Sequence, residues 1–254
     1  MRDSSLFRLG LLSLVGVTAG LHGQITEWTT TVAPGRFLVE MDALSLKLNH
    51  DGDNKYTAFA VASTFLSTGL TENWDVQVGA ELFLNQKFDS GGLTDRRSGI
   101  GDVYFRTKWR FYEAADTYTS VALLPYVKLP TNSGGVGNKS MEGGLIVPWQ
   151  TELAGGIKMT AMAQLDFRRN DNDDGYDSFW YASMALQRQV TKAIGLYGEL
   201  TLGKSSGGAP CAGTMGGGVT LATSENFAWD FAIYRGLSNG ADDWNHVLRL
   251  NWGF

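Results

Sequence analysis

Apolar and polar residues alternate along most of the chain from residue 36 onward, in stretches of about ten residues. In the last stretch, one parity carries only aromatic, histidine and aliphatic residues: Trp244, His246, Leu248, Leu250, Trp252 and Phe254. Successive side chains of a β-strand point to opposite faces. The stretch therefore predicts a strand with one face that is apolar to the last residue, and some apolar phase must cover that face.

The same alternation predicts about twelve strands, each long for a globular protein. We expect them near residues 36–49, 54–67, 72–85, 98–112, 116–129, 140–149, 151–168, 177–190, 192–204, 212–223, 226–237 and 243–254. Polar, Gly-rich loops such as residues 86–97 alternate with tight turns, one of them near Pro148. An even strand count places both termini at one end, and the loops and turns then segregate to opposite ends, as in outer-membrane barrels. The predicted fold class is all-β, a transmembrane antiparallel barrel.

The polar parity of these strands carries charges of both signs, which we expect to line the lumen. The predicted lumen residues are Glu81, Asp102, Arg106, Lys108, Arg110, Glu142, Lys158, Asp166, Arg168, Glu199, Asp230 and Arg249. A charge on the lipid face costs roughly 2–4 kcal/mol at mid-bilayer, whereas water or a partner compensates it in a lumen. Either a salt-bridge network narrows the pore and guides solute, or these charges form a solvated wall without selectivity.

Aromatic residues cluster near the predicted strand ends, where outer-membrane barrels carry girdles at the headgroup level. The predicted girdle residues are Trp74, Trp109, Phe111, Trp180, Trp244 and Trp252. The alternative is that these rings fill the core of a soluble sandwich, since the pattern of a single strand fits both folds.

The N-terminus predicts export. Arg2 and Arg8 precede an apolar stretch that is shorter than the about 20 residues of a membrane-spanning helix, and small residues follow it. We expect a signal peptide over residues 1–23, cleaved between Ala19 and Gln24. Residues 24–35 would form a short periplasmic segment, and residues 36–254 the barrel.

Composition narrows the classes of function. The chain has 32 Gly, 8 Trp, 9 Tyr and 13 Phe among 254 residues but only 5 Pro, which suits a barrel or sandwich more than a helical fold. Its formal net charge of -5, without a basic stripe, argues against a nucleic-acid partner. The single cysteine, Cys211, excludes an internal disulfide.

Three stretches carry a resemblance to a known family: "GDVYFRTKWRF" at 101–111, "LPYVKLPT" at 124–131 and "NFAWDFAIYRGLSN" at 226–239. Over roughly residues 36–254, the chain resembles the outer-membrane family labelled "putative meta-pathway of phenol degradation". The resemblance implies a transporter that passes small aromatic or apolar compounds through the outer membrane. A final strand ending in Phe254 also resembles the signature of bacterial outer-membrane barrels, which implies recognition by the barrel assembly machinery.

Other functions have weaker signals. A structural or adhesive barrel is the main alternative, although the loops are too short for an obvious adhesin head. An outer-membrane hydrolase would need a serine within reach of a histidine, and the residues on the same face as His246 include none. The acidic loop at 170–177 offers oxygen ligands but lacks the rest of a calcium-binding motif. We therefore predict neither an enzyme nor a bound metal or cofactor.

Overall fold

A computed structural model describes residues 24–137, 139–170, 172 and 174–254. Within these residues the chain forms thirteen strands. They are β1 (Phe37–Asp51), β2 (Asn54–Thr71), β3 (Trp74–Ser90), β4 (Leu93–Gly99), β5 (Val103–Ala114), β6 (Thr119–Leu129), β7 (Glu142–Leu153), β8 (Ile157–Arg169), β9 (Tyr176–Gln189), β10 (Ile194–Ser205), β11 (Ala212–Ser224), β12 (Phe227–Gly236) and β13 (Trp244–Gly253). No helix in the described part of the chain is long and apolar enough to cross a membrane.

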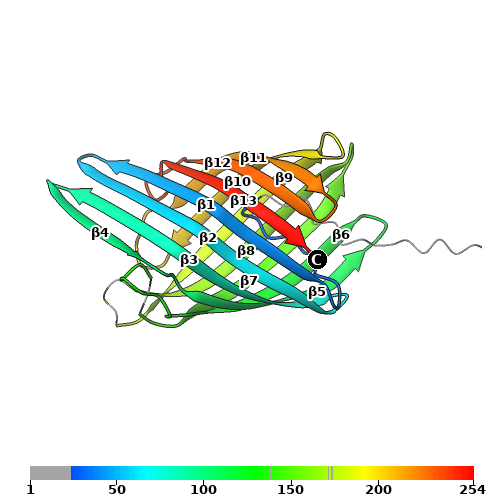
Figure 1. Cartoon of the computed structure of the whole chain (residues 1–254), viewed down its shortest axis with the longest axis horizontal. Coiled ribbons are helices and arrows are strands. Elements are labelled where there is room, and N and C mark those ends of the chain that lie inside the picture. The colour runs from blue at the N-terminus through cyan, green and yellow to red at the C-terminus, as the bar shows by residue number, and fades with distance from the viewer. Residues whose placement is uncertain (1–23, 138, 171, 173) are drawn as a thin grey trace, which may run out of the picture.

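The strands close into one antiparallel barrel (Figure 1). Apart from β4 and β5, strands that are neighbours in sequence pair with each other, and β13 closes the ring by pairing with β1 from Leu38↔Gly253 to Leu48↔Trp244. Strands β4 and β5 occupy one position in the ring, because both pair with β3, β4 near its end and β5 near its beginning. The barrel therefore has twelve strand positions, and the predicted fold class is confirmed.

Connections of different length lie at opposite ends of the barrel. The connections at the end that also carries the C-terminus, which we call the turn end, are all short (Figure 1). The longer connections all lie at the other end, the loop end, together with the tight β1–β2 and β3–β4 turns. One predicted loop is in fact regular structure, because residues 86–97 form most of the β3–β4 hairpin, with Gly91 and Gly92 at positive φ in its turn. The sequence hides this hairpin because all of β4 except its last residue is exposed and carries no apolar face.

The turn expected near Pro148 lies further along the chain. Pro148 is buried within β7, opposite Met162 of β8, and the turn falls at residues 154–156. Gly155 and Gly156 adopt positive φ angles of 79° and 70°, which glycine tolerates without strain. Proline is accepted inside β7 because no ladder pair joins it to β6.

In the middle of β1 and β2, irregular backbone positions change which side chains face the lumen. The β1–β2 and β1–β13 ladders both skip one residue after Asp42, and Ala62 has a positive φ of 55°. The neighbouring strand β3 changes parity at the same level: Leu82 and Phe83 are both exposed, and Leu84 lines a cavity inside the barrel. Strict alternation along the strand predicted at 72–85 puts Leu84 on the same, outward face as Trp74 and Val78, and this prediction is therefore wrong for Leu84.

The barrel has a polar interior and an apolar exterior. Charged side chains such as Asp75, Asp102 and Asp230 are at most 1% exposed, whereas Val78, Leu200 and Phe231 are about half exposed on the outer wall. A soluble sandwich would show the reverse, with apolar side chains buried and charges in water. The distribution is that of a barrel whose outer wall contacts lipid.

Candidate functional site

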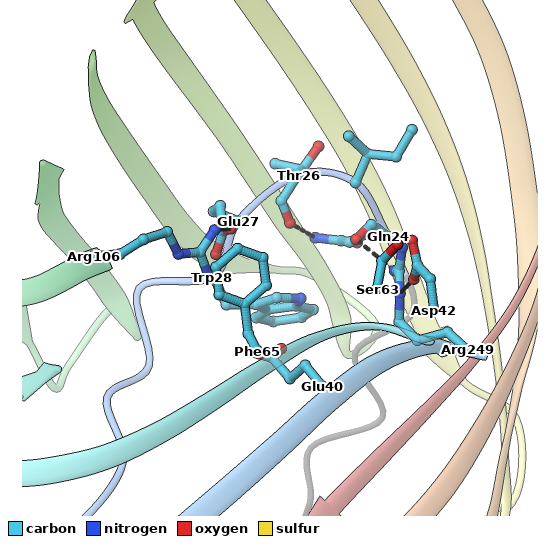
Figure 2. Close-up of a pocket in the computed structure, with 11 residues that line it drawn as sticks. Gln24, Thr26, Glu27, Trp28, Glu40, Asp42, Ser63, Phe65, Arg106 and Arg249 are labelled. Carbon is cyan, nitrogen blue, oxygen red and sulfur yellow. Dashed lines mark hydrogen bonds and ion pairs between the residues drawn. The ribbon is translucent and has the colours of Figure 1, made fainter. Parts of the chain in front are cut away.

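The lumen is occupied by the chain's own beginning. Residues 24–33, which we call the N-terminal segment, cross the inside of the barrel before β1 begins (Figure 2). Thr26, Trp28, Thr29 and Val32 are all at most 7% exposed. The sequence predicts a periplasmic segment at 24–35, and the structure instead places its greater part between the inward faces of the strands. This is possible because the inward side chains offer polar partners to a backbone that could not be buried in an apolar core.

Glu199 on β10 is one anchor of the segment. Its carboxylate accepts hydrogen bonds from the backbone N–H of Ile25 at 2.9 Å and of Thr26 at 2.6 Å, and from the Thr26 hydroxyl. Tyr234 on β12 donates its hydroxyl to the same carboxylate at 2.8 Å. Glu199 is only 3% exposed, so these four donors replace the water that a buried carboxylate requires.

A second anchor is an ion cluster around Glu27. Arg106 on β5 lies 2.8 Å from one carboxylate oxygen and Lys108 lies 3.6 Å from the other. Lys108 also donates to the Thr30 carbonyl at 3.4 Å, and the Arg106 guanidinium lies 3.8 Å from the centre of the Phe65 ring. Burial alone would raise the pKa of Glu27, but Arg106 and Lys108 outweigh it and hold this pKa below its ordinary value.

Further contacts fix both ends of the segment. At its beginning, Arg249 on β13 donates to the Gln24 carbonyl at 3.0 Å. In its middle, the Thr29 and Ser120 hydroxyls lie 2.6 Å apart. Near its end, the Val32 N–H donates to Asp75 at 3.0 Å. Gly69 on β2 gives the segment room to leave the lumen, because any side chain there would overlap the backbone of residues 32 and 33.

A cavity of about 560 Å³ lies on the loop side of the segment; we call it the vestibule. Its walls carry several aromatic and aliphatic side chains, among them Tyr56, Phe59, Phe65, Leu84, Tyr104 and Val247. The loop at residues 130–141 folds over it, with Val136 only 7% exposed and its carbonyl 3.5 Å from the Gln86 amide nitrogen. Ile25 of the segment reaches its floor.

On the opposite side of the lumen, two tyrosine rings fill much of the space. Tyr197 and Tyr234 fill the lumen beside β10–β12, where Tyr197 donates its hydroxyl to Asp230 at 3.0 Å. The rings fit because Gly216 and Gly218 on β11 point at them: a side chain at either position would overlap Tyr234 or Tyr197. The vestibule therefore lies toward β1, β2 and β3, while a smaller cavity of about 260 Å³ lies against Tyr234, lined also by Tyr181 and Thr201.

The predicted lumen charges carry most of this polar interior. Arg106, Lys108, Glu199 and Arg249 bind the N-terminal segment, and Lys158 lies 5.9 Å from the Trp28 ring. Lys128, which the prediction missed, lies 3.5 Å from Asp102 and 2.6 Å from Glu142. The selectivity that we attach to these charges stays a prediction.

The remaining predicted charges have local partners. Arg168 binds Asp166 at 2.7 Å, and Asp230 lies 4.0 Å from Arg249. Glu81 lines the vestibule. Arg110 lies at the turn end of β5, 3.3 Å from Glu113, and does not reach the segment.

None of the residues of the segment itself was predicted from the sequence to lie in the lumen. The signal that could have found it is "ITEWTTTV" at 25–32, where a tryptophan and two aliphatic residues interrupt what looks like a solvated polar linker. Glu27 and Asp42 were missed because neither lies on a stretch that we singled out for its charges.

The predicted girdle residues are exposed on the outer wall, by 40–60% of their surface. Trp74 of β3 lies opposite Trp109 of β5 in the ladder, and Trp252 packs on Phe254 with ring centres 4.7 Å apart. The girdle role of these six residues at a membrane interface stays a prediction.

The features expected of a hydrolase are not assembled in the described residues. His246 stacks on Trp244, and His50 is exposed near the end of β1, 3.9 Å from Asp243. Within the described part of the chain, no group of three His, Cys, Asp or Glu side chains could hold a metal ion. Part of the acidic 170–177 loop lies outside the described residues, so its calcium binding stays open.

Comparison with known proteins gives the family. The family model described as "Putative MetA-pathway of phenol degradation" matches residues 23–254, almost the whole chain. The chain belongs to this family. No curated protein sequence matches it.

Among solved structures, this family member is similar to the COG4313 outer membrane channel from Pseudomonas putida F1, with a TM-score of 0.68 at 13% identity over 89% of this chain and 98% of that one. It is also similar to the β-domain of the Bordetella autotransporter BrkA, with a TM-score of 0.57 at 14% identity over 87% and 100% of the two chains. Identities this low show a shared barrel fold and leave the function to the residues.

Proposed function

We propose that the protein is an outer-membrane channel for small apolar compounds, aromatic ones included, and that the N-terminal segment closes it at rest. The observation that carries the proposal is the vestibule, a cavity of about 560 Å³ with aromatic walls inside a closed barrel. Its volume falls within the roughly 300–1,000 Å³ of small-molecule sites. The aromatic walls offer stacking surfaces to an apolar ring, while the tight ion pairs between them need no solute charge.

The N-terminal segment is the part that must move. It forms the floor of the vestibule, and most of its contacts are hydrogen bonds and ion pairs that water can replace. The barrel wall, by contrast, is held by continuous ladders whose opening would leave backbone groups unpaired in lipid. Displacement of the segment is therefore the least costly route to an open pore.

Placement in the outer membrane is part of the proposal. The apolar outer wall and the family support it. The signal peptide expected at residues 1–23 lies outside the described residues. Recognition of Phe254 by the barrel assembly machinery stays part of the proposal, as do the lipid and small-molecule partners.

A reversible cross-link tests the channel and its closure together. Thr29→Cys and Ser120→Cys replace two hydroxyls that lie 2.6 Å apart, close enough for a disulfide after small adjustments, in a Cys211→Ser background. Cells that lack their own copy would be tested for uptake of labelled toluene. We expect oxidation to abolish the uptake that the protein confers and reduction to restore it, while the Cys211→Ser protein responds to neither.

Two outcomes would count against the proposal in different ways. Equal uptake in the oxidised and reduced states would show that the segment does not gate the pore. No uptake above that of cells without the protein would reject the channel, and a structural or adhesive barrel would become the better explanation.

A further inference from the structure

A second cavity, of about 270 Å³, lies between the N-terminal segment and the inward face of β1 and β2. Figure 2 shows its lining, with Glu40 and Asp42 from β1 on one side and Glu27 and Trp28 from the segment on the other. It shares Ile25, Asp42, Ser63, Phe65 and Arg249 with the vestibule. The two cavities therefore meet at these residues and together follow β1 and β2 past the segment.

The cations that border this second cavity are paired. Arg106 lies 2.8 Å and Lys108 3.6 Å from Glu27, and Arg249 lies 2.6 Å from Asp42 and 4.0 Å from Asp230. Glu40 lines the same cavity but has no ion pair or hydrogen bond to a side chain elsewhere in the described chain. In the lining of the cavity itself, two cations, Arg106 and Arg249, face three carboxylates, those of Glu27, Asp42 and Glu40. One negative charge of the lining is therefore uncompensated, and the contacts assign it to Glu40.

We infer that the two cavities form a residual passage that conducts small cations such as K⁺ past the seated segment, and that Glu40 sets its preference for cations over anions. A fixed carboxylate on the wall of a narrow aqueous passage attracts counter-ions and repels anions. Passage of ions goes beyond the proposed transport of apolar solutes, because it does not need the segment to move.

Reversal potentials test the inference. The purified full-length protein would be inserted into planar bilayers under a KCl gradient, with wild type expected to favour K⁺. Glu40→Gln should lower the ratio of K⁺ to Cl⁻ permeability about 25-fold, because one unit charge about 4 Å away in water favours K⁺ and disfavours Cl⁻ by about five-fold each. Glu225→Gln is the matched control, since Glu225 lies exposed in the β11–β12 turn, and should leave the ratio unchanged.

A thiol at position 40 makes the test independent of folding differences between variants. In a Cys211→Ser background, Glu40→Cys channels already open in the bilayer would be treated with methanethiosulfonate reagents. A sulfonate-bearing reagent should restore the cation preference, and a trimethylammonium-bearing reagent should turn the preference toward Cl⁻.

An unchanged reversal potential after both reagents, or after Glu40→Gln, would overturn the inference. Absence of any wild-type conductance would also overturn it. Neither result would affect the proposed uptake of apolar solute, which depends on displacement of the segment and is measured by the cross-link.

Discussion

Two glycines decide how the closed half of the lumen is filled. Gly216 and Gly218 face inward from β11, and the rings of Tyr234 and Tyr197 lie over them. Tyr234 in turn donates to Glu199, the carboxylate that anchors the N-terminal segment. Gly216 leaves room for the Tyr234 ring, and Tyr234 holds the carboxylate that binds residues 25 and 26. The glycine on β11 thereby helps to set the position of the N-terminal segment.

Gly216→Ala tests this link. The new methyl group would overlap the Tyr234 ring, and we expect a loss of about 1–3 kcal/mol in the free energy of unfolding, as for other overpacked sites. Urea titration of the barrel in detergent, followed by its heat-modifiable migration, measures it. Gly198→Ala is the control, because its methyl group would point into open space with the nearest atom 4.0 Å away. Equal midpoints for the two variants would contradict the link.

At the scale of elements, the strands other than β4 were predictable, whereas β4 and the N-terminal segment were not. The expected strand at 212–223 and the observed β11 at Ala212–Ser224 differ by one residue, because an alternating pattern and turn residues mark both ends. The predicted lumen charges also follow from parity alone. The N-terminal segment, which these charges bind, was not predictable because a segment buried in a polar lumen needs no apolar face. Its sequence therefore resembles that of a solvated linker. Leu84 was misplaced because bulges that reverse parity carry no clear mark in the sequence.

The ion cluster of the segment predicts its response to acid. The pKa of Glu27 lies below the ordinary value of 4.5, since Arg106 and Lys108 outweigh the effect of burial, with Arg249 acting in the same direction. A lowered pKa means that the stabilisation is complete above pH 4.5 and is lost as the pH falls through the lowered value. The contribution of Glu27 to single-channel conductance, taken as the difference between wild type and Glu27→Gln, should therefore stay constant from neutral pH to about 4.5 and disappear below it.

Glu27→Gln provides the comparison. This variant lacks the titrating carboxylate, so its conductance should be higher already at neutral pH and should show no rise with acid that depends on position 27. A wild-type rise that begins well above pH 4.5 would mean that another group, such as Glu40 nearby, controls the segment.

At the scale of the whole molecule, the contacts that close the barrel extend to Phe254. Phe37 and Phe254 exchange two backbone hydrogen bonds, of 2.8 and 3.0 Å, and their rings stack with centres 5.6 Å apart. The apolar face of the final strand therefore ends against the beginning of the first. Only an apolar phase outside the barrel, which we take to be lipid, remains to cover Trp252 and its neighbours.

Phe254→Ala separates closure from assembly. Loss of the ring stack should cost about 0.5–1.5 kcal/mol beyond the area lost, so the variant refolded in detergent should be only modestly less stable than wild type. In cells, if the assembly machinery reads this residue, the folded fraction on an unboiled gel should fall much further. Phe231→Ala, on the outer wall in the middle of β12, is the control. Similar folded fractions for the two variants in cells would argue against an assembly signal.

The contact between Arg249 and the Gln24 carbonyl joins residues that are 225 positions apart. In the export that we propose, the N-terminus arrives first, yet the partners of the segment are spread over β3, β5, β6, β8, β9, β10 and β13. The earliest part of the described chain to arrive can be seated only after the latest part has been delivered. During biogenesis the barrel wall consequently forms around an open pore. The N-terminal segment, although it arrives first, closes this pore last.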